Sequence, residues 1–102
     1  MKPRVAAIVL AAGRGERFGA DKVNLSLGGK PVWRWSFEAF LAHPEVDEVG
    51  LVCAAEHVEA YRIAAPEAAF VVAGGASRQE SSELGVQATQ AEIVLVHDFG
   101  LS

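Results

Sequence analysis

Cysteine is almost missing from this chain of 102 residues, which contains Cys53 alone. One thiol cannot form a disulfide framework within the chain or a cysteine-based zinc site. Because Cys53 ends an apolar run that begins at Val49, we expect its thiol to be buried and inert. The chain also lacks an apolar stretch long enough for a signal peptide or a membrane span, so we expect a cytoplasmic protein with no membrane partner.

Positive charge is in the minority. The 9 lysines and arginines are outnumbered by 13 aspartates and glutamates, which gives a formal net charge of −4. This balance argues against a broad surface for nucleic acid or anionic lipid, so we expect no nucleic-acid partner. The hydrophobic fraction of 51% is typical of a folded globular protein, and the length allows at most one domain.

Short apolar runs alternate with segments of helical pattern. Strands are expected over 5–10, within 46–53, over 70–72 and over 93–96, and helices over 31–42, over 56–63 and after Ser77. This alternating order predicts an α/β fold, a Rossmann-like parallel sheet with helices on both faces. Ser77 and Glu80 form a capping-box pattern at the start of the third helix.

A glycine-rich, basic loop follows the first apolar run. Its sequence from 11 to 22 is AAGRGERFGADK, with glycine at 13, 15 and 19. Glycine lets the backbone lie close to a ligand, and successive N–H groups in such a turn attract anions. The loop lacks the GxxxxGK[ST] pattern of a P-loop, and Phe18 breaks the GxGxxG dinucleotide pattern. Its cations Arg14, Arg17 and Lys22 favour a nucleoside triphosphate at the carboxyl end of a strand.

Two further segments are expected at the same edge of the sheet. Residues 74–82 read GGASRQESS, so two glycines precede a helix whose first turns carry Arg78 and Ser81. The last apolar run leads into His97 and Asp98. Mg²⁺ favours one or two carboxylates together with nucleotide phosphates. Because the carboxyl ends of parallel strands share one edge, a nucleotide with its metal would span all three segments.

The motifs AAGRGERFG, GGASRQESS and VLVHD together resemble those of the 2-C-methyl-D-erythritol 4-phosphate cytidylyltransferases of the non-mevalonate isoprenoid pathway. The resemblance implies a fold of the nucleotide-diphospho-sugar transferase type and transfer of CMP from CTP to a sugar-alcohol phosphate, with release of pyrophosphate and assistance from Mg²⁺. It implies catalytic roles for Arg17 and Lys22 at the triphosphate and a metal-binding role for Asp98. The implied nucleotide-binding residues are Ala11, Ala12, Gly13, Arg14, Gly15, Gly75, Ala76, Arg78 and Ser81.

Members of that family are longer than this chain. Residues 1–102 therefore resemble the N-terminal nucleotide-binding portion of a single nucleotidyltransferase domain, truncated before its C-terminal half, and the full-length enzyme is expected to be a homodimer. Two departures from the family pattern stand out. Lys22 lies closer to Arg17 than usual, and Leu101 takes the position of an arginine.

Three alternatives stay open. Ribitol 5-phosphate cytidylyltransferases share nearly all of these motifs, and the spacing after Asp21 and Lys22 also resembles the molybdenum-cofactor guanylyltransferases. In a different class, the chain is an inactive nucleotide-binding or association module whose open sheet edge is completed by a second chain. Competition between CTP and GTP separates the guanylyltransferase, acceptor assays separate the ribitol enzyme, and light scattering tests the association module.

Overall fold

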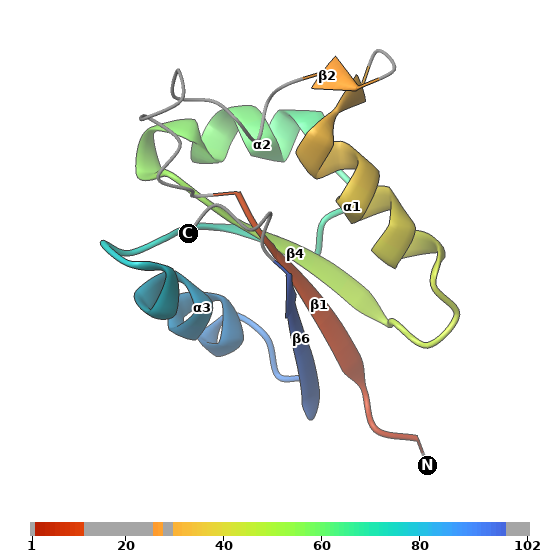
Figure 1. Cartoon of the computed structure of the whole chain (residues 1–102). Helices are drawn as coiled ribbons and strands as arrows, with labels where there is room; N and C mark the ends of the chain where they lie inside the picture. Colours follow the sequence, from red (N-terminus) through yellow and green to blue (C-terminus); the bar gives the residue numbers. More distant parts are fainter. Residues whose placement is uncertain (1, 12–25, 28–29, 98–102) are drawn as a thin grey trace.

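A four-stranded parallel sheet forms the centre of the computed structural model, which describes residues 2–11, 26–27 and 30–97 (Figure 1). The sheet has the strand order β5-β4-β1-β6, and β2 and β3 form a second, antiparallel sheet. The strands are β1 (Val5–Leu10), β2 (Ser26–Leu27), β3 (Lys30–Pro31), β4 (Glu48–Cys53), β5 (Phe70–Ala73) and β6 (Ile93–His97). The helical segments are α1 (Val32–Ala42), the 3-10 turn η3 (Ala55–His57), α2 (Val58–Ala64) and α3 (Arg78–Gln87).

Strands β1 and β4 are the buried middle of the sheet, because β1 throughout and β4 after Glu48 lack charged side chains and are covered on both faces. They pair in parallel, with Val9 beside Leu51. Successive side chains of a strand point to opposite faces. Val9 and Leu51 accordingly join one core cluster, whereas Ile8 and Val52 join a second cluster on the other side.

Helices α1 and α2 cover one face of the sheet and α3 covers the other (Figure 1). On the first face Trp33 of α1 packs edge-on against Tyr61 of α2, with ring centroids 5.0 Å apart. On the second face α3 approaches the sheet at Gly85. A Cβ atom there would lie 3.0 Å from methyl carbons of both Ile8 and Val52, so only glycine allows this spacing without a shift.

The expected α/β fold with helices on both faces is confirmed, and the strand over 5–10 has the expected bounds. Four details differ. Pro31 pairs with Ser26 in the short β2-β3 hairpin, which was not expected, and α1 begins one residue later. The helix expected over 56–63 is divided into η3 and α2. The last strand extends to His97.

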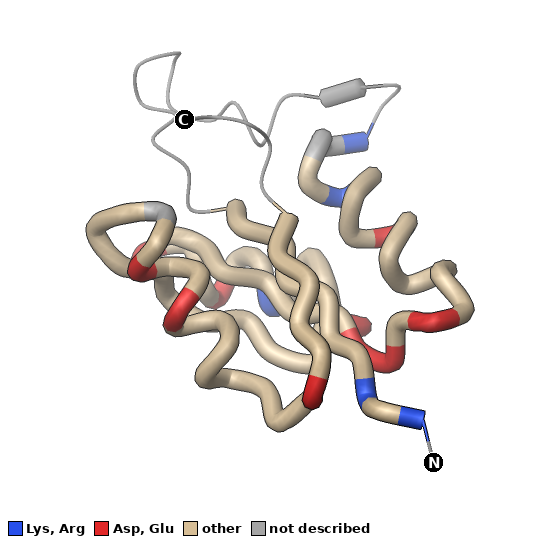
Figure 2. Tube along the Cα trace, turned by 60° about the horizontal axis from the view of Figure 1, so that its bottom comes forward, with Lys and Arg blue, Asp and Glu red and all other residues tan. Residues whose placement is uncertain are grey.

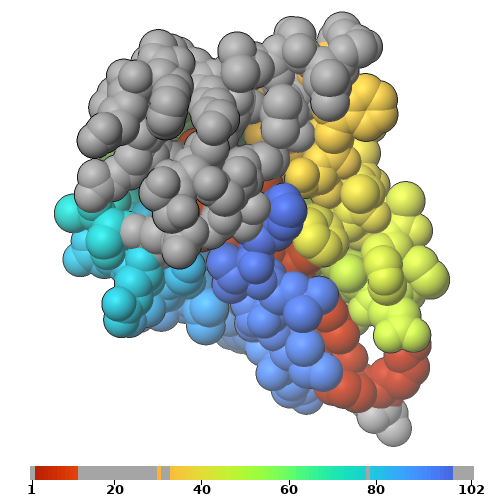
Figure 3. Space-filling model, in the orientation of Figure 1, coloured from red at the N-terminus to blue at the C-terminus, as the bar shows by residue number. Residues whose placement is uncertain are grey.

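Strand β6 forms one edge of the sheet, and in the described part of the chain it pairs with β1 alone. Ile93, Leu95 and Val96 each remain more than 40% exposed, and the blue residues of this region lie open at the surface in Figure 3. An edge strand with apolar side chains on both faces is a template for further pairing. None of the helices described here has both the length and the apolar character needed to cross a membrane.

Candidate functional site

The carboxyl edge of the sheet contains a topological switch point between β1 and β6. From β1 the chain crosses to β4 and then β5 on one side, and it later returns to place β6 on the other side of β1. Ligands of open α/β sheets bind outside the carboxyl ends of the strands at such a point. The basic loop begins after β1 and β6 ends at His97, so both predicted segments start at this point.

Ala11 is the one residue of the predicted basic loop that the structure describes. It is buried, and its N–H donates to the carbonyl of Val52 at 2.6 Å, which ties the start of the loop to β4. The other predicted residues of this loop, and the predicted metal ligand, lie outside the described residues: Ala12, Gly13, Arg14, Gly15, Arg17, Lys22 and Asp98.

The glycine turn after β5 brings three predicted residues together. Gly75 donates its N–H to the Oγ of Ser81 at 3.1 Å, and Ala76 donates its N–H to Oε1 of Glu80 at 2.6 Å. Ser81 is only 2% exposed, so its hydroxyl lies inside the turn. Arg78 begins α3, and its side chain is not among those described.

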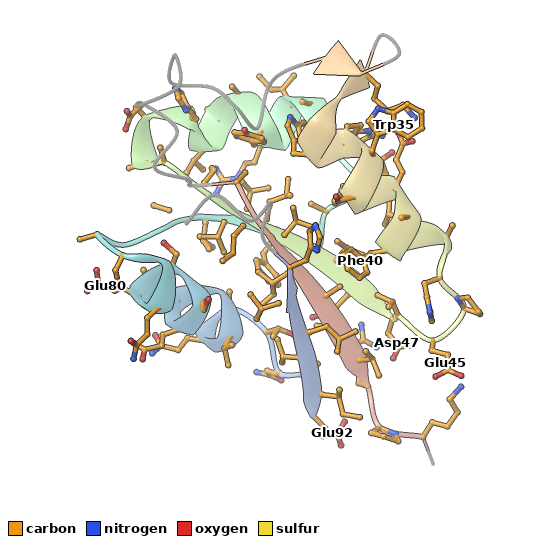
Figure 4. The ribbon with its side chains drawn as sticks, in the orientation of Figure 1. Trp35, Phe40, Glu45, Asp47, Glu80 and Glu92 are labelled. Atoms are coloured by element: carbon orange, nitrogen blue, oxygen red, sulfur yellow. The ribbon has the colours of Figure 1, made fainter. Side chains whose placement is uncertain are left out.

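The predicted capping box of α3 has two hydrogen bonds. The one to the Ser77 side chain is confirmed, and the one to the Glu80 carboxylate has a different donor. The Oγ of Ser77 accepts from the N–H of Glu80 at 3.1 Å, as the pattern predicts. The Glu80 carboxylate accepts from Ala76, one residue before the N-cap, so it reaches into the glycine turn (Figure 4). A Cβ atom at Gly75 would overlap the Glu80 side chain, so the Glu80 carboxylate packs directly against the turn.

His97 anchors the carboxyl end of β6 to α1. Its Nε2 lies 3.3 Å from the Oγ of Ser36, and its ring packs edge-on against Phe40 with centroids 5.8 Å apart. Sequence reasoning missed this anchor because 61 residues separate Ser36 from His97. The contact fixes the last described residue of the strand at the switch point.

A cluster of ion pairs joins α1 to β3 of the β2-β3 hairpin and to Glu67. Arg34 donates to Glu38 at 2.7 Å and to Glu67 at 2.8 Å, and Lys30 donates to Glu38 at 2.5 Å. Hydrogen bonding to Glu67 and then to Glu38 raises the pKa of Arg34, although partial burial opposes it. Lys30 also lies 4.2 Å from the ring centre of the exposed Trp35. Figure 2 shows these basic positions at β3 and α1.

A hollow lies at the opposite, amino edge of the sheet. It has a volume of about 540 Å³ and is lined in part by Arg4, Glu48, Thr89 and Glu92. Arg4 already pairs with Glu48 at 3.0 Å, and its backbone N–H donates to Glu92 at 2.8 Å. Two carboxylates against one arginine disfavour a triphosphate here, which leaves the carboxyl edge as the candidate nucleotide site.

Cys53 is a poor candidate for catalysis or metal binding. Its side chain is buried at the end of β4, and desolvation raises the pKa of the thiol to about 11. A thiol that stays protonated at neutral pH is a poor nucleophile and a poor metal ligand. The expectation of a buried cysteine is therefore confirmed. Within residues 2–11, 26–27 and 30–97, no three His, Cys, Asp or Glu side chains group together as metal ligands.

The open parallel sheet, whose strand order reverses at β1 with a glycine turn at the same edge, is a Rossmann-like α/β fold. A family model described as IspD, 2-C-methyl-D-erythritol 4-phosphate cytidylyltransferase, matches residues 5–100. The chain belongs to this family, as the three motifs predicted.

Relatives and solved structures agree with this assignment. The bifunctional enzyme IspD/IspF of Rhodospirillum rubrum is 41% identical over an alignment that covers 93% of this chain and 27% of that protein. The 2-C-methyl-D-erythritol 4-phosphate cytidylyltransferase of Thermobifida fusca is 43% identical over an alignment that covers 95% of this chain and 43% of that protein. A crystal structure of 4-diphosphocytidyl-2C-methyl-D-erythritol synthase matches with a TM-score of 0.76 and 25% identity, over 96% of this chain and 47% of that one. The chain thus spans less than half the length of each.

Proposed function

We propose that this chain supplies the nucleotide-binding portion of a CTP-dependent cytidylyltransferase. The complete enzyme transfers CMP from CTP to 2-C-methyl-D-erythritol 4-phosphate and releases pyrophosphate. The observation that carries this proposal is the position of the family's motifs in the fold. The first and third motifs adjoin β1 and β6 at the switch point, and the second forms the glycine turn after β5. Because these strands are parallel, all three motifs share the edge at which such sheets bind ligands.

The nucleotide is divided between two parts of this edge. The base lies near Ala11 and the turn at Gly75, Ala76 and Ser81, whose N–H groups are already used within the chain. The triphosphate lies along the basic loop, where Arg14, Arg17 and Lys22 supply positive charge. This division assigns the charged part of the ligand to the charged part of the site.

The reaction is an in-line displacement at the α-phosphorus of CTP. An oxygen of the acceptor's phosphate forms the new P–O bond, the bond to the β-phosphate bridge breaks, and pyrophosphate leaves with the electron pair. Arg17 and Lys22 stabilise the negative charge that grows on the transferred group. Transfer of this kind depends on positioning and electrostatic stabilisation, so no covalent intermediate with the protein is needed.

A divalent cation such as Mg²⁺ would suit this chemistry, because it would neutralise negative charge on the phosphate groups. Asp98, directly after β6, is the residue that would hold it. The described residues offer no preformed metal cluster. One carboxylate completed by nucleotide phosphates and water is an arrangement that Mg²⁺ accepts. The longer family member would add the acceptor-binding residues and assemble as a homodimer.

Titration calorimetry of CTP into this chain with Mg²⁺, with GTP as comparator, tests the proposal. We expect saturable binding of CTP and weak binding of GTP. Arg17→Ala should weaken CTP binding by about tenfold or more, as expected for a lost charged hydrogen bond. Arg62→Ala is the matched control, because Arg62 is exposed on α2, where it pairs with the exposed Glu59. A preference for GTP would favour a guanylyltransferase, and absence of CTP binding by the folded chain would contradict the proposal.

A further inference from the structure

The glycine turn after β5 has its backbone donors occupied by its own chain. Gly74 donates to the carbonyl of Cys53 at 2.8 Å, which extends the pairing of β4 with β5. Gly75 donates to Ser81 and Ala76 donates to Glu80, at 3.1 and 2.6 Å. All three N–H groups of residues 74–76 are therefore used inside the protein.

This occupation changes what the turn can bind. A glycine-rich turn that leads into a helix ordinarily offers its N–H groups to phosphate, helped by the positive end of the helix dipole. Here the carboxylate of Glu80 takes that place, and its negative charge opposes a phosphate group nearby. Backbone carbonyls and the carboxylate are hydrogen-bond acceptors, which suit a donor such as the exocyclic amino group of a base.

The bond from Ala76 to Glu80 goes beyond the requirement for capping a helix. A capping-box glutamate accepts from the N-cap residue itself, which is Ser77 in α3. Glu80 instead accepts from the residue before the cap and lies over Gly75, where a Cβ atom would meet it. The N-cap hydrogen bond is separate, because the backbone N–H of Glu80, not its carboxylate, donates to the Oγ of Ser77. Holding the turn and capping the helix are thus two separable contacts.

We propose that Glu80 is a positioning residue of the nucleotide site, whose carboxylate holds the turn at 74–76 in an acceptor-lined shape that receives the base and keeps phosphate out. The inference rests on the proposed function, since it assigns the base to this turn. Glu80 acts through the backbone of Gly75 and Ala76, and it takes no part in the bonds that form or break. Ser81, buried beneath the turn, supports the same shape through Gly75.

Three variants separate positioning from helix capping. Glu80→Ala removes the acceptor, Glu80→Gln keeps an oxygen at the same reach, and Ser77→Ala removes the cap but leaves the bond to Ala76. Glu83→Ala is the matched control, because Glu83 is an exposed glutamate of the same helix that accepts a hydrogen bond from Gln79 at 3.4 Å. The readouts are amide hydrogen exchange at Ala76, thermal unfolding, and calorimetric affinity for CTP and for inorganic pyrophosphate.

We expect Glu80→Ala to speed exchange at Ala76 and to weaken CTP binding about tenfold, and to strengthen pyrophosphate binding relative to CTP. Glu80→Gln should restore most of the CTP affinity. Ser77→Ala should lower thermal stability with a smaller effect on CTP, and Glu83→Ala should change neither. Loss of CTP affinity that follows thermal stability in both Ser77→Ala and Glu80→Ala would overturn the proposal. So would a Glu80→Ala chain that binds CTP as the native chain does, whereas a native chain that binds no CTP overturns the proposed function as well.

Discussion

The hydroxyl of Ser36 lies 3.3 Å from Nε2 of His97, so α1 is joined to the last residue of β6 at the carboxyl edge of the sheet. The ring of Phe40, one turn further along α1, packs edge-on against the same histidine. Phe40 and Ser36 share one face of the helix because they are four residues apart. The end of β6 is therefore held by a polar and an apolar contact together.

His97→Ala should lower the free energy of unfolding by about 1–3 kcal/mol, since it removes both contacts. Ser36→Ala should cost about 1 kcal/mol, and the double variant should lose less than the sum because the two residues share one bond. Urea unfolding of the four proteins measures this. His57→Ala serves as control and should be near neutral, because His57 is exposed and its side chain makes no capping hydrogen bond to α2. Strictly additive losses would show that Ser36 and His97 do not interact.

The Arg34 cluster predicts a stability that falls in acid. The pKa of Glu38 is lowered chiefly by its hydrogen bond from Lys30, and that of Glu67 chiefly by its hydrogen bond from Arg34. A carboxyl whose pKa is lower in the folded state binds protons less readily there than in the unfolded chain. Its stabilising effect is complete above the ordinary value of 4.5 and is lost as the pH falls through the lowered value.

Arg34→Met should therefore lose less stability than the native chain between pH 7 and pH 3, while being less stable at pH 7. Urea midpoints measured across that range test the difference in slope. Arg62→Met is the matched control, because its pair with Glu59 at 3.3 Å joins two largely exposed side chains. Equal acid slopes in the native chain and Arg34→Met would rule out the pairs of Arg34 with Glu38 and Glu67 as the source.

Close packing of α3 predicts that Gly85 resists enlargement. A Cβ atom would lie 3.0 Å from Ile8 and Val52, so Gly85→Val should destabilise by about 1–3 kcal/mol through overpacking. Gly85→Ala should cost less, because better helix propensity offsets part of the crowding by about 1 kcal/mol. Thermal unfolding monitored by circular dichroism measures both. Val86→Ala, at an exposed position of the same helix, is the control, and a Gly85→Val chain as stable as native would contradict the packing.

The open edge at β6 predicts self-association at high protein concentration. Leu95 is 44% exposed on the edge strand, and neighbouring Val96 is equally exposed on the opposite face. Leu95→Lys should reduce the association because a buried charge disfavours strand pairing. Sedimentation velocity over a concentration series tests this. Ile63→Lys, at a position 75% exposed on α2, should leave the association unchanged, and a native chain that stays monomeric throughout would refute the prediction.

Periodicity in the sequence was enough to predict the sheet and its helices. The run 5–10 is continuously apolar and became β1, and the capping pattern at Ser77 marked the start of α3. The β2-β3 hairpin was missed because strands of two residues leave no periodic signal. The Arg34 cluster was missed because Arg34 and Glu67 are 33 residues apart.

The sequence motifs indicated where the candidate site lies, but they did not predict its hydrogen bonds. Ser81 was expected at the nucleotide, and the structure adds that its hydroxyl is turned to Gly75 inside the turn. Glu80 was expected to complete a capping box, yet it accepts from Ala76. Such a contact depends on the conformation of the glycine turn, which the order of residues does not reveal. The predicted roles of Arg17, Lys22 and Asp98 stay predictions, because these residues lie outside the described part of the chain.

The most direct test of a nucleotide site at the carboxyl edge is a nitrogen-15 NMR titration of this chain with CTP and Mg²⁺. We expect the amide signals of Ala11, Gly75, Ala76 and His97 to shift together and to saturate. Signals of Asp47 and Glu92, which lie at the other end of the strands in Figure 4, should stay in place. Shifts gathered around Asp47 and Glu92, with the carboxyl edge unchanged, would contradict the account.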